Sequence, residues 1–210
     1  MSKERESSHQ EPLFDLGELA RRAVAEKPWV GAPLAYTTDY YDPADLDAAM
    51  DRYITQYGSF GCLPRSHMWR RIYADVSVVT VDHAMAKFVA DTRCADADHV
   101  HELLPNALMH QAICPACRWH AIGGEDEVVV AWHDHAMPGW RTLPVLPSTL
   151  RGDEKKQKAG AAAWVAKHYP AEWQIPGAPV ITERTKGATR PVERRSPFGG
   201  YDIATANLSI

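Results

Sequence analysis

The chain of 210 residues lacks the features of several protein classes. No stretch approaches the roughly 18 consecutive apolar residues of a membrane-spanning helix, and the polar start, MSKERESSHQEP, has no apolar signal-peptide region. Only four cysteines are present, which argues against a disulfide scaffold and for a reducing compartment. No P-loop, GxGxxG or GxSxG motif and no internal repeat occurs. We therefore expect a cytoplasmic protein without membrane contact, and the common nucleotide and nucleophile chemistries have no support.

Charge is distributed unevenly along the chain. Acidic residues outnumber basic ones in residues 1–150, the reverse holds in residues 151–210, and the net charge is −4. An acidic body is poorly suited to wrapping duplex DNA, because non-specific affinity comes from neutralising phosphates. The basic end is either solvated or contacts nucleic acid or another anionic partner. The candidates for such a contact are Arg184, Lys186, Arg190, Arg194 and Arg195.

Two cysteines and two histidines form the clearest chemical pattern. Cys114 and Cys117 belong to a Cys-Pro-Ala-Cys segment, and His133 and His135 to a His-Asp-His segment downstream. Thiolate and imidazole are the ligands of closed, tetrahedral structural zinc sites. The pattern predicts one structural Zn²⁺ bound by these four residues. The alternative is a reduced Cys-x-x-Cys turn beside two hydrogen-bonded histidines.

A β-hairpin would bring the two pairs together. Residues 118–122 and 127–131 are partly β-branched runs, and the Gly-Gly-Glu-Asp loop between them is typical of a hairpin. In that register Cys114 lies opposite His135, and histidines two positions apart on a strand share one face. Two other histidines could replace one of these ligands, His110 or His120.

Helix signals occupy much of the remaining chain. An N-cap at Asp15 predicts a helix to about Lys27, Asp42-Pro43 starts a second helix that ends before Gly58, and a third is expected over 153–169. Asp82 would cap a further helix over 83–92. These elements indicate an α+β fold, a small zinc-stabilised antiparallel sheet or hairpin packed with three to four helices.

The same signals suggest how the chain is organised. We expect a flexible tail over residues 1–14, a single domain over 15–169 with a zinc-ribbon-like hairpin at 114–140, and a basic C-terminal arm over 170–210. The arm is rich in Pro, Gly, Thr and Arg and shows no helical period. It either lies extended on the body or becomes ordered on a partner.

A short segment in the N-terminal tail has a specific resemblance. Gln10, Leu13 and Phe14 form Gln-x-x-Leu-Phe, which resembles the peptide by which bacterial replication and repair proteins dock on the DNA polymerase sliding clamp; Pro12 departs from the usual Ser or Asp. The resemblance implies an amide hook and two apolar anchors in a preformed groove. The structural alternative is a plain lead-in to the first helix.

The Asp134-His135-x-x-Pro run after a Cys-x-x-Cys is similar to the first part of HNH-type nucleases. This resemblance implies that Cys114 and Cys117 hold a structural zinc, His135 acts as general base and Asp134 binds a catalytic metal. Two features depart from the family. No second Cys-x-x-Cys follows, and the helix predicted at 153–169 offers no Asn or acidic ligand on its packed face.

The WHDHAMPGW run and the Ala-, Arg- and Asp-rich composition resemble uncharacterised proteins of actinomycetes and their phages, over about residues 60–150. This resemblance implies a bacterial or phage host setting, and it does not indicate any activity. The sequence as a whole favours a non-catalytic zinc-binding adaptor or regulator, and docking of its N-terminal peptide on the sliding clamp would place it in replication or repair. Two alternatives remain, a degenerate HNH-like nuclease and a DNA-binding zinc-ribbon regulator of phage or mobile-element origin.

Overall fold

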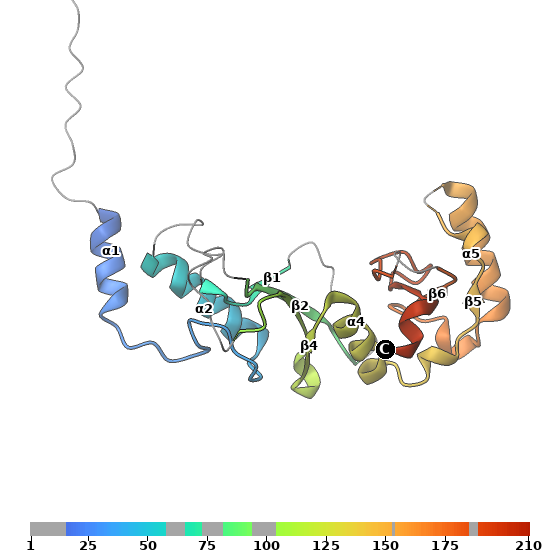
Figure 1. The fold of residues 1–210 in the computed structure, drawn as a ribbon. Coiled ribbons are helices and arrows are strands. Elements are labelled where there is room, and N and C mark those ends of the chain that lie inside the picture. The colour runs from blue at the N-terminus through green and yellow to red at the C-terminus, as the bar shows by residue number, and fades with distance from the viewer. Residues whose placement is uncertain (1–15, 58–65, 73–81, 94–103, 153, 185–188) are drawn as a thin grey trace, which may run out of the picture.

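The computed structural model describes residues 16–57, 66–72, 82–93, 104–152, 154–184 and 189–210. Helices α1 (Leu16–Ala25) and α2 (Pro43–Tyr57) lie at one end of an elongated body, with an antiparallel sheet in the middle and α5 (Lys155–His168) at the other end (Figure 1). The α+β fold class predicted from the sequence is confirmed. No helix in the described ranges is long and apolar enough to cross a membrane.

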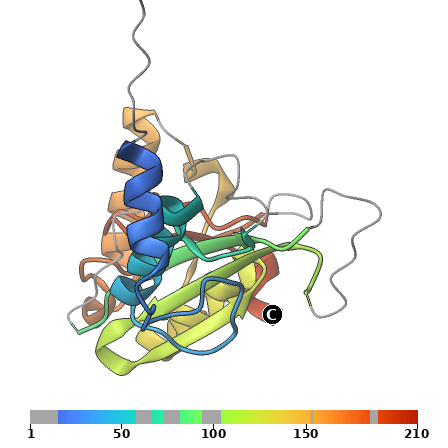
Figure 2. The same ribbon diagram turned by 90° about the vertical axis from the view of Figure 1, so that its left-hand side faces the viewer.

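The antiparallel sheet has four strands in the order β1-β2-β3-β4, and Figure 2 shows it after a turn of 90° from the view of Figure 1. Its strands are β1 (Arg70–Arg71), β2 (Ala86–Asp91), β3 (Leu108–Cys114) and β4 (Trp119–Gly123). Ala86 pairs with Ile113, so β2 begins beside the end of β3. A single 3-10 turn, Pro115–Cys117, joins β3 to β4, and Arg118 closes it with a left-handed φ of 52°. The Cys-x-x-Cys segment therefore forms the turn of the β3–β4 hairpin.

The strand predicted over residues 127–131 is wrong, because these residues belong to helix α4 (Glu125–Ala136). The N–H of Gly124 donates to Glu127 Oε2 at 2.7 Å, a helix-start contact, and the first turn is acidic, which the helix dipole favours. Three consecutive valines follow, and all are buried in α4. Packing of this helix against β3 and β4 overrides the β preference of the valines.

The helix predicted over residues 83–92 is also wrong. Residues 86–91 form β2, which pairs with β1 on one side and β3 on the other. Phe88 and Ala90 are fully buried. Apolar spacing over so short a run fits both a helix and a buried strand, and the ladders on both sides decide between them.

The C-terminal part of the chain builds a second, parallel sheet. Its order is β5-β6-β7, with β5 (Val145–Leu146), β6 (Val180–Thr182) and β7 (Asp202–Ala204). The prolines on either side of β5 suit its position at the sheet edge. Within the described part of residues 170–210, β6 and β7 complete this sheet, and Ile181, Tyr201 and Ile203 are buried.

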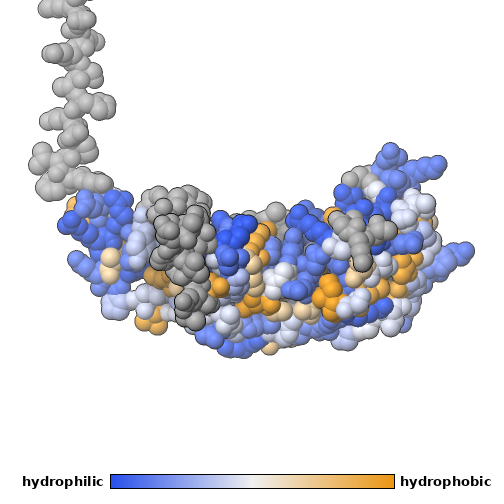
Figure 3. Space-filling view, viewed as in Figure 1, coloured by the Kyte–Doolittle hydropathy of each residue, from blue (hydrophilic) through white to orange (hydrophobic). Residues whose placement is uncertain are grey.

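Two hydrophobic clusters fill the interior. The larger joins α4, α5 and the parallel sheet around Trp132, Trp140 and Tyr201, and the smaller joins α2 to the antiparallel sheet around Leu46 and Phe88. On the face seen in Figure 3, hydrophilic residues dominate and apolar ones are scattered between them.

One buried cation connects three parts of the fold. Lys87 of β2 has a side chain that is 4 % exposed, and its Nζ lies 2.7 Å from Glu193 Oε1 and 3.6 Å from Glu125 Oε1. The hydroxyl of Tyr201 donates to the same Glu193 oxygen at 2.7 Å. This network attaches the C-terminal segment to both the antiparallel sheet and α4.

Candidate metal centre

Four side chains that can bind a metal ion converge beside the β3–β4 turn: His83, Cys114, Cys117 and His135, here called the Cys2His2 group. Their ligand atoms all lie within 4.8 Å of one another. His83 Nδ1 is 3.3 Å from Cys114 Sγ and 3.5 Å from Cys117 Sγ. Tetrahedral zinc with two sulfur and two nitrogen ligands has ligand–ligand edges of about 3.4–3.8 Å. These two separations are therefore close to those of a zinc tetrahedron.

Three separate segments position these ligands. Cys114 is the buried last residue of β3, and Cys117 is exposed at the end of the turn. His83 precedes β2, whose first residue pairs with Ile113 next to Cys114. His135 comes from the last turn of α4, which packs on β3 and β4. The group thus depends on strand pairing and helix packing together.

The ring of His135 is held in a defined orientation. It stacks on Trp119, with centroids 4.5 Å apart and an interplanar angle of 1°, and it meets His83 edge-on at 5.0 Å. Its Nε2 is buried and has no hydrogen-bond partner in the described part of the chain. A buried polar atom without a partner is unfavourable, and coordination to a metal ion would satisfy it.

The electrostatics of the group favour a bound cation. Burial and then the neighbouring His83 lower the pKa of His135, which favours the neutral ring, the form that binds metals. Burial and then the neighbouring Cys114 sulfur raise the pKa of Cys117. Two thiolates side by side repel each other, and a divalent cation between them removes this cost.

His133 lies outside the group, contrary to the ligand set predicted from the sequence. On a helix, residues two positions apart point about 200° away from each other, so His133 and His135 face different ways. His133 is fully buried, its Nδ1 is 2.7 Å from the carbonyl oxygen of Val129, and burial lowers its pKa to about 4. The structure thus brings together Cys114, Cys117 and His135 of the predicted set and adds His83.

The two alternative histidines have other surroundings. His120 of β4 has its Nδ1 2.8 Å from Gln111 Nε2, and His110 of β3 is buried, with a pKa lowered first by that burial. Neither belongs to the Cys2His2 group. Sequence reasoning missed His83 because it lies 31 residues before Cys114 with no recognisable spacing, and only the pairing of β2 with β3 brings it near.

Asp134 has its carboxylate engaged elsewhere. Arg141 donates to Oδ1 at 2.8 Å and to Oδ2 at 2.7 Å, and Trp140 Nε1 donates to Oδ1 at 2.8 Å. The hydrogen bond from Arg141 is the main cause of the lowered pKa of Asp134. Asp134 does not belong to the Cys2His2 group, so the HNH-like arrangement of Asp134 and His135 on one metal finds no geometric support.

The predicted partner-binding residues fall into three situations. Gln10, Leu13, Phe14 and Lys186 lie outside the described residues. Arg184 has a side chain that is 5 % exposed and pairs with Asp202 at 3.3 Å, so it belongs to the interior and cannot contact a partner from this position. The remaining predicted residues are exposed, namely Arg190, which pairs with Glu125 at 3.0 Å, Arg194 and Arg195.

Comparison with known proteins gives one match. The family described as "Family of unknown function (DUF6349)" matches residues 31–209. No curated protein and no solved structure matches the chain. The matched range includes all four residues of the Cys2His2 group and both sheets, and it begins after the Gln10 to Phe14 peptide.

Proposed function

Because the chain belongs to this family of unknown function, its role has to be argued from its own residues, and we propose that it is a non-catalytic zinc-binding adaptor or regulatory protein. One observation carries the proposal: four ligand atoms from three segments lie within 4.8 Å of one another. The zinc ion would join the β3–β4 turn to the start of β2 and the end of α4. Its setting would be the cytoplasm, where thiols stay reduced.

The ligand set favours zinc over other metals. Two thiolates and two imidazoles suit Zn²⁺, whereas Mg²⁺ and Ca²⁺ require oxygen ligands. The Cys2His2 group contains no carboxylate. Two thiolates also balance the charge of the ion. Four protein ligands complete the tetrahedron and leave no position for a reactive water, which is the arrangement of structural zinc sites.

The local structure gives zinc a mechanical role. Residues 115–118 are exposed, and a single short turn with a left-handed Arg118 connects the two strands. An exposed turn is held less firmly than the packed strands that it joins. A zinc ion bound to Cys114 and Cys117 on one side and to His83 and His135 on the other would fix this turn to the body.

X-ray absorption spectroscopy of the zinc-loaded protein tests the closed site. We expect a first shell of two sulfur ligands at about 2.3 Å and two nitrogen ligands at about 2.0–2.1 Å. Cys117→Ser should replace one sulfur by a lighter ligand or lose the metal. A water oxygen in the shell of the unmodified protein, or a single sulfur ligand, would contradict a closed structural site.

The adaptor role is proposed through the N-terminal peptide. Gln10, Leu13 and Phe14 precede α1 and the range of the family match, so docking there would leave the Cys2His2 group in place. The full chain should bind a purified bacterial sliding clamp, and the double change Leu13→Ala and Phe14→Ala should weaken binding at least about tenfold, because both anchors are lost.

Glu11→Ala is the matched control for the clamp experiment, since position 11 is not one of the three key positions of the peptide. It should bind as the unmodified chain does in surface plasmon resonance. Equal binding by the double variant, or no binding by the unmodified chain, would remove the sliding clamp as partner and leave the zinc proposal intact.

A further inference from the structure

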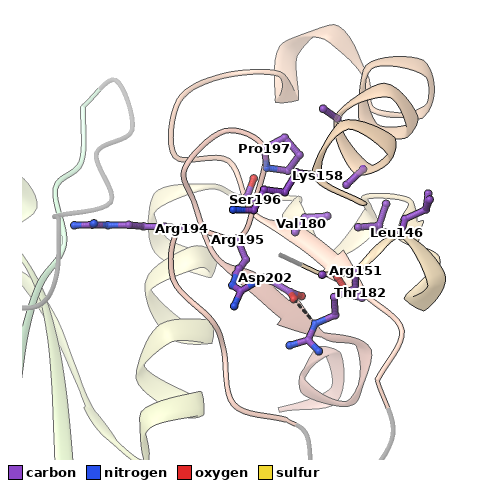
Figure 4. A pocket seen from close by; sticks show the side chains of 14 residues that line it. Leu146, Arg151, Lys158, Val180, Thr182, Arg194, Arg195, Ser196, Pro197 and Asp202 are labelled. Atoms are coloured by element: carbon purple, nitrogen blue, oxygen red, sulfur yellow. Dashed lines mark hydrogen bonds and ion pairs between the residues drawn. The ribbon is translucent and has the colours of Figure 1, made fainter. Parts of the chain in front are cut away.

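A cavity of about 330 Å³ lies between α5, the parallel sheet and the C-terminal segment (Figure 4). This volume is at the lower end of the range of small-molecule sites. Its lining includes the apolar side chains of Leu146, Leu150, Ala161 and Val180. Its polar lining includes Arg151, Lys158, Thr182, Ser196, Arg195 and Asp202. The cavity, here called the α5 cavity, therefore has an apolar part and a polar, mostly basic part.

The carboxylate of Asp202 holds a cation in place at the polar part. Asp202 is nearly buried, and two guanidinium groups share its carboxylate: Arg151 Nε lies 2.8 Å from Oδ2 and an Arg184 amino group 3.3 Å from Oδ1. Of these two cations, Arg151 lines the cavity. The hydrogen bond of the carboxylate with Nε fixes the Arg151 guanidinium, drawn as a dashed line in Figure 4, and leaves the terminal amino groups for another acceptor. Carboxylate and phosphate groups are the acceptors that this geometry favours.

Thr182 provides independent evidence for a ligand. It is fully buried, it lines the α5 cavity, and its hydroxyl has no hydrogen-bond partner in the described ranges. Buried hydroxyl groups are normally satisfied, and leaving one without a partner is destabilising. An anionic group bound to Arg151 in this cavity can accept the hydrogen bond of Thr182.

We propose that the α5 cavity binds a small amphipathic anion, whose carboxylate or phosphate group contacts Arg151 and Thr182 while its apolar part packs against Leu146, Leu150 and Val180. The apolar lining argues against a nucleic-acid backbone as the ligand, because its phosphates would place only charged groups in the cavity. The site is independent of the Cys2His2 group, with which it shares no residue.

Titration calorimetry on the full, zinc-loaded chain tests the proposal. Phenyl phosphate and benzoate carry the two possible anionic groups on one apolar body. At least one of them should bind with a dissociation constant below about 1 mM. Inorganic phosphate and benzyl alcohol should each bind at least about tenfold more weakly, because the first lacks the apolar part and the second lacks the charge. Equal binding of inorganic phosphate, or no saturable binding of either anion, would overturn the proposal.

Three variants locate the binding. Arg151→Ala should weaken binding at least about tenfold, because it removes a charge-assisted hydrogen bond. Arg190→Ala is the control, since this exposed side chain pairs with Glu125 and does not line the cavity, and it should change affinity less than about twofold. Thr182→Val preserves shape and should weaken binding several-fold without lowering the thermal midpoint. Equal losses for Arg151→Ala and Arg190→Ala, or unchanged binding by Thr182→Val, would contradict the assigned contacts.

Discussion

Replacing His83 by alanine is expected to reduce bound zinc from about one ion per chain to nearly none. His83 Nδ1 lies within 3.5 Å of both cysteine sulfurs, so the change removes one of four ligands from the centre of the group. The measurement is metal analysis by mass spectrometry on protein purified without added zinc. His120→Ala is the matched control, because this histidine lies on β4 outside the group and should leave zinc content unchanged.

Loss of zinc should also destabilise the fold. Binding to the folded state alone adds to its stability, so chelation should lower the free energy of unfolding by roughly 3 kcal/mol or more. For a chain of this size, that loss corresponds to a fall of about 6–12 °C in the thermal midpoint. Chelator should have no such effect on His83→Ala, which is already without zinc. Full zinc content in His83→Ala would show that the structure assigns the wrong ligand.

The second large effect is expected at Lys87. Lys87→Ala should lower the free energy of unfolding by about 2–3 kcal/mol, because it removes the buried cation that pairs with both Glu193 and Glu125. The expected loss of stability is large because the lysine is buried. It stays below the full cost of a buried unpaired charge because both carboxylate side chains are 23 % exposed and water can solvate them. Urea denaturation followed by circular dichroism gives the difference.

Two further variants separate charge from packing at this position. Lys87→Met retains most of the side-chain volume over the ring of Tyr201 and removes the charge, so it should lose nearly as much stability as Lys87→Ala. Arg93→Ala removes an exposed cation that pairs with Asp91, and it should have little effect. Full stability in Lys87→Met would mean that packing, and not the ion pair, attaches the C-terminal segment.

Local sequence signals predicted the helices well where end signals and apolar spacing agree. The helix expected from Asp42-Pro43 to Gly58 is α2, and that expected over 153–169 contains α5. The signals failed at α4, where three valines suggest a strand and the acidic turn after Gly124 indicates a helix start. The positions of Cys114 and Cys117 at one hairpin turn depend on β3, which pairs with β4 over residues 110–123.

The metal centre shows why ligand pairs are easier to predict than complete sites. Two cysteines separated by two residues are visible in any reading of the sequence, since the spacing itself is the signal. A strand would place His133 and His135 on one face, whereas on α4 they face different ways and only His135 belongs to the Cys2His2 group. His83 comes from a segment whose position is set by long-range strand pairing, which local patterns do not contain.

The wide separation of the four ligands along the chain has a consequence for biosynthesis. Until His135 has left the ribosome and α4 has docked on the hairpin, the nascent polypeptide offers only an incomplete set of donors, and two thiols alone hold zinc weakly. At the proposed zinc site, loading of the ion would therefore come late, after the long-range contacts of β2, β3 and α4 have formed. Zinc occupancy would then report that the chain has reached its native topology, and not merely that the Cys-x-x-Cys segment has been synthesised.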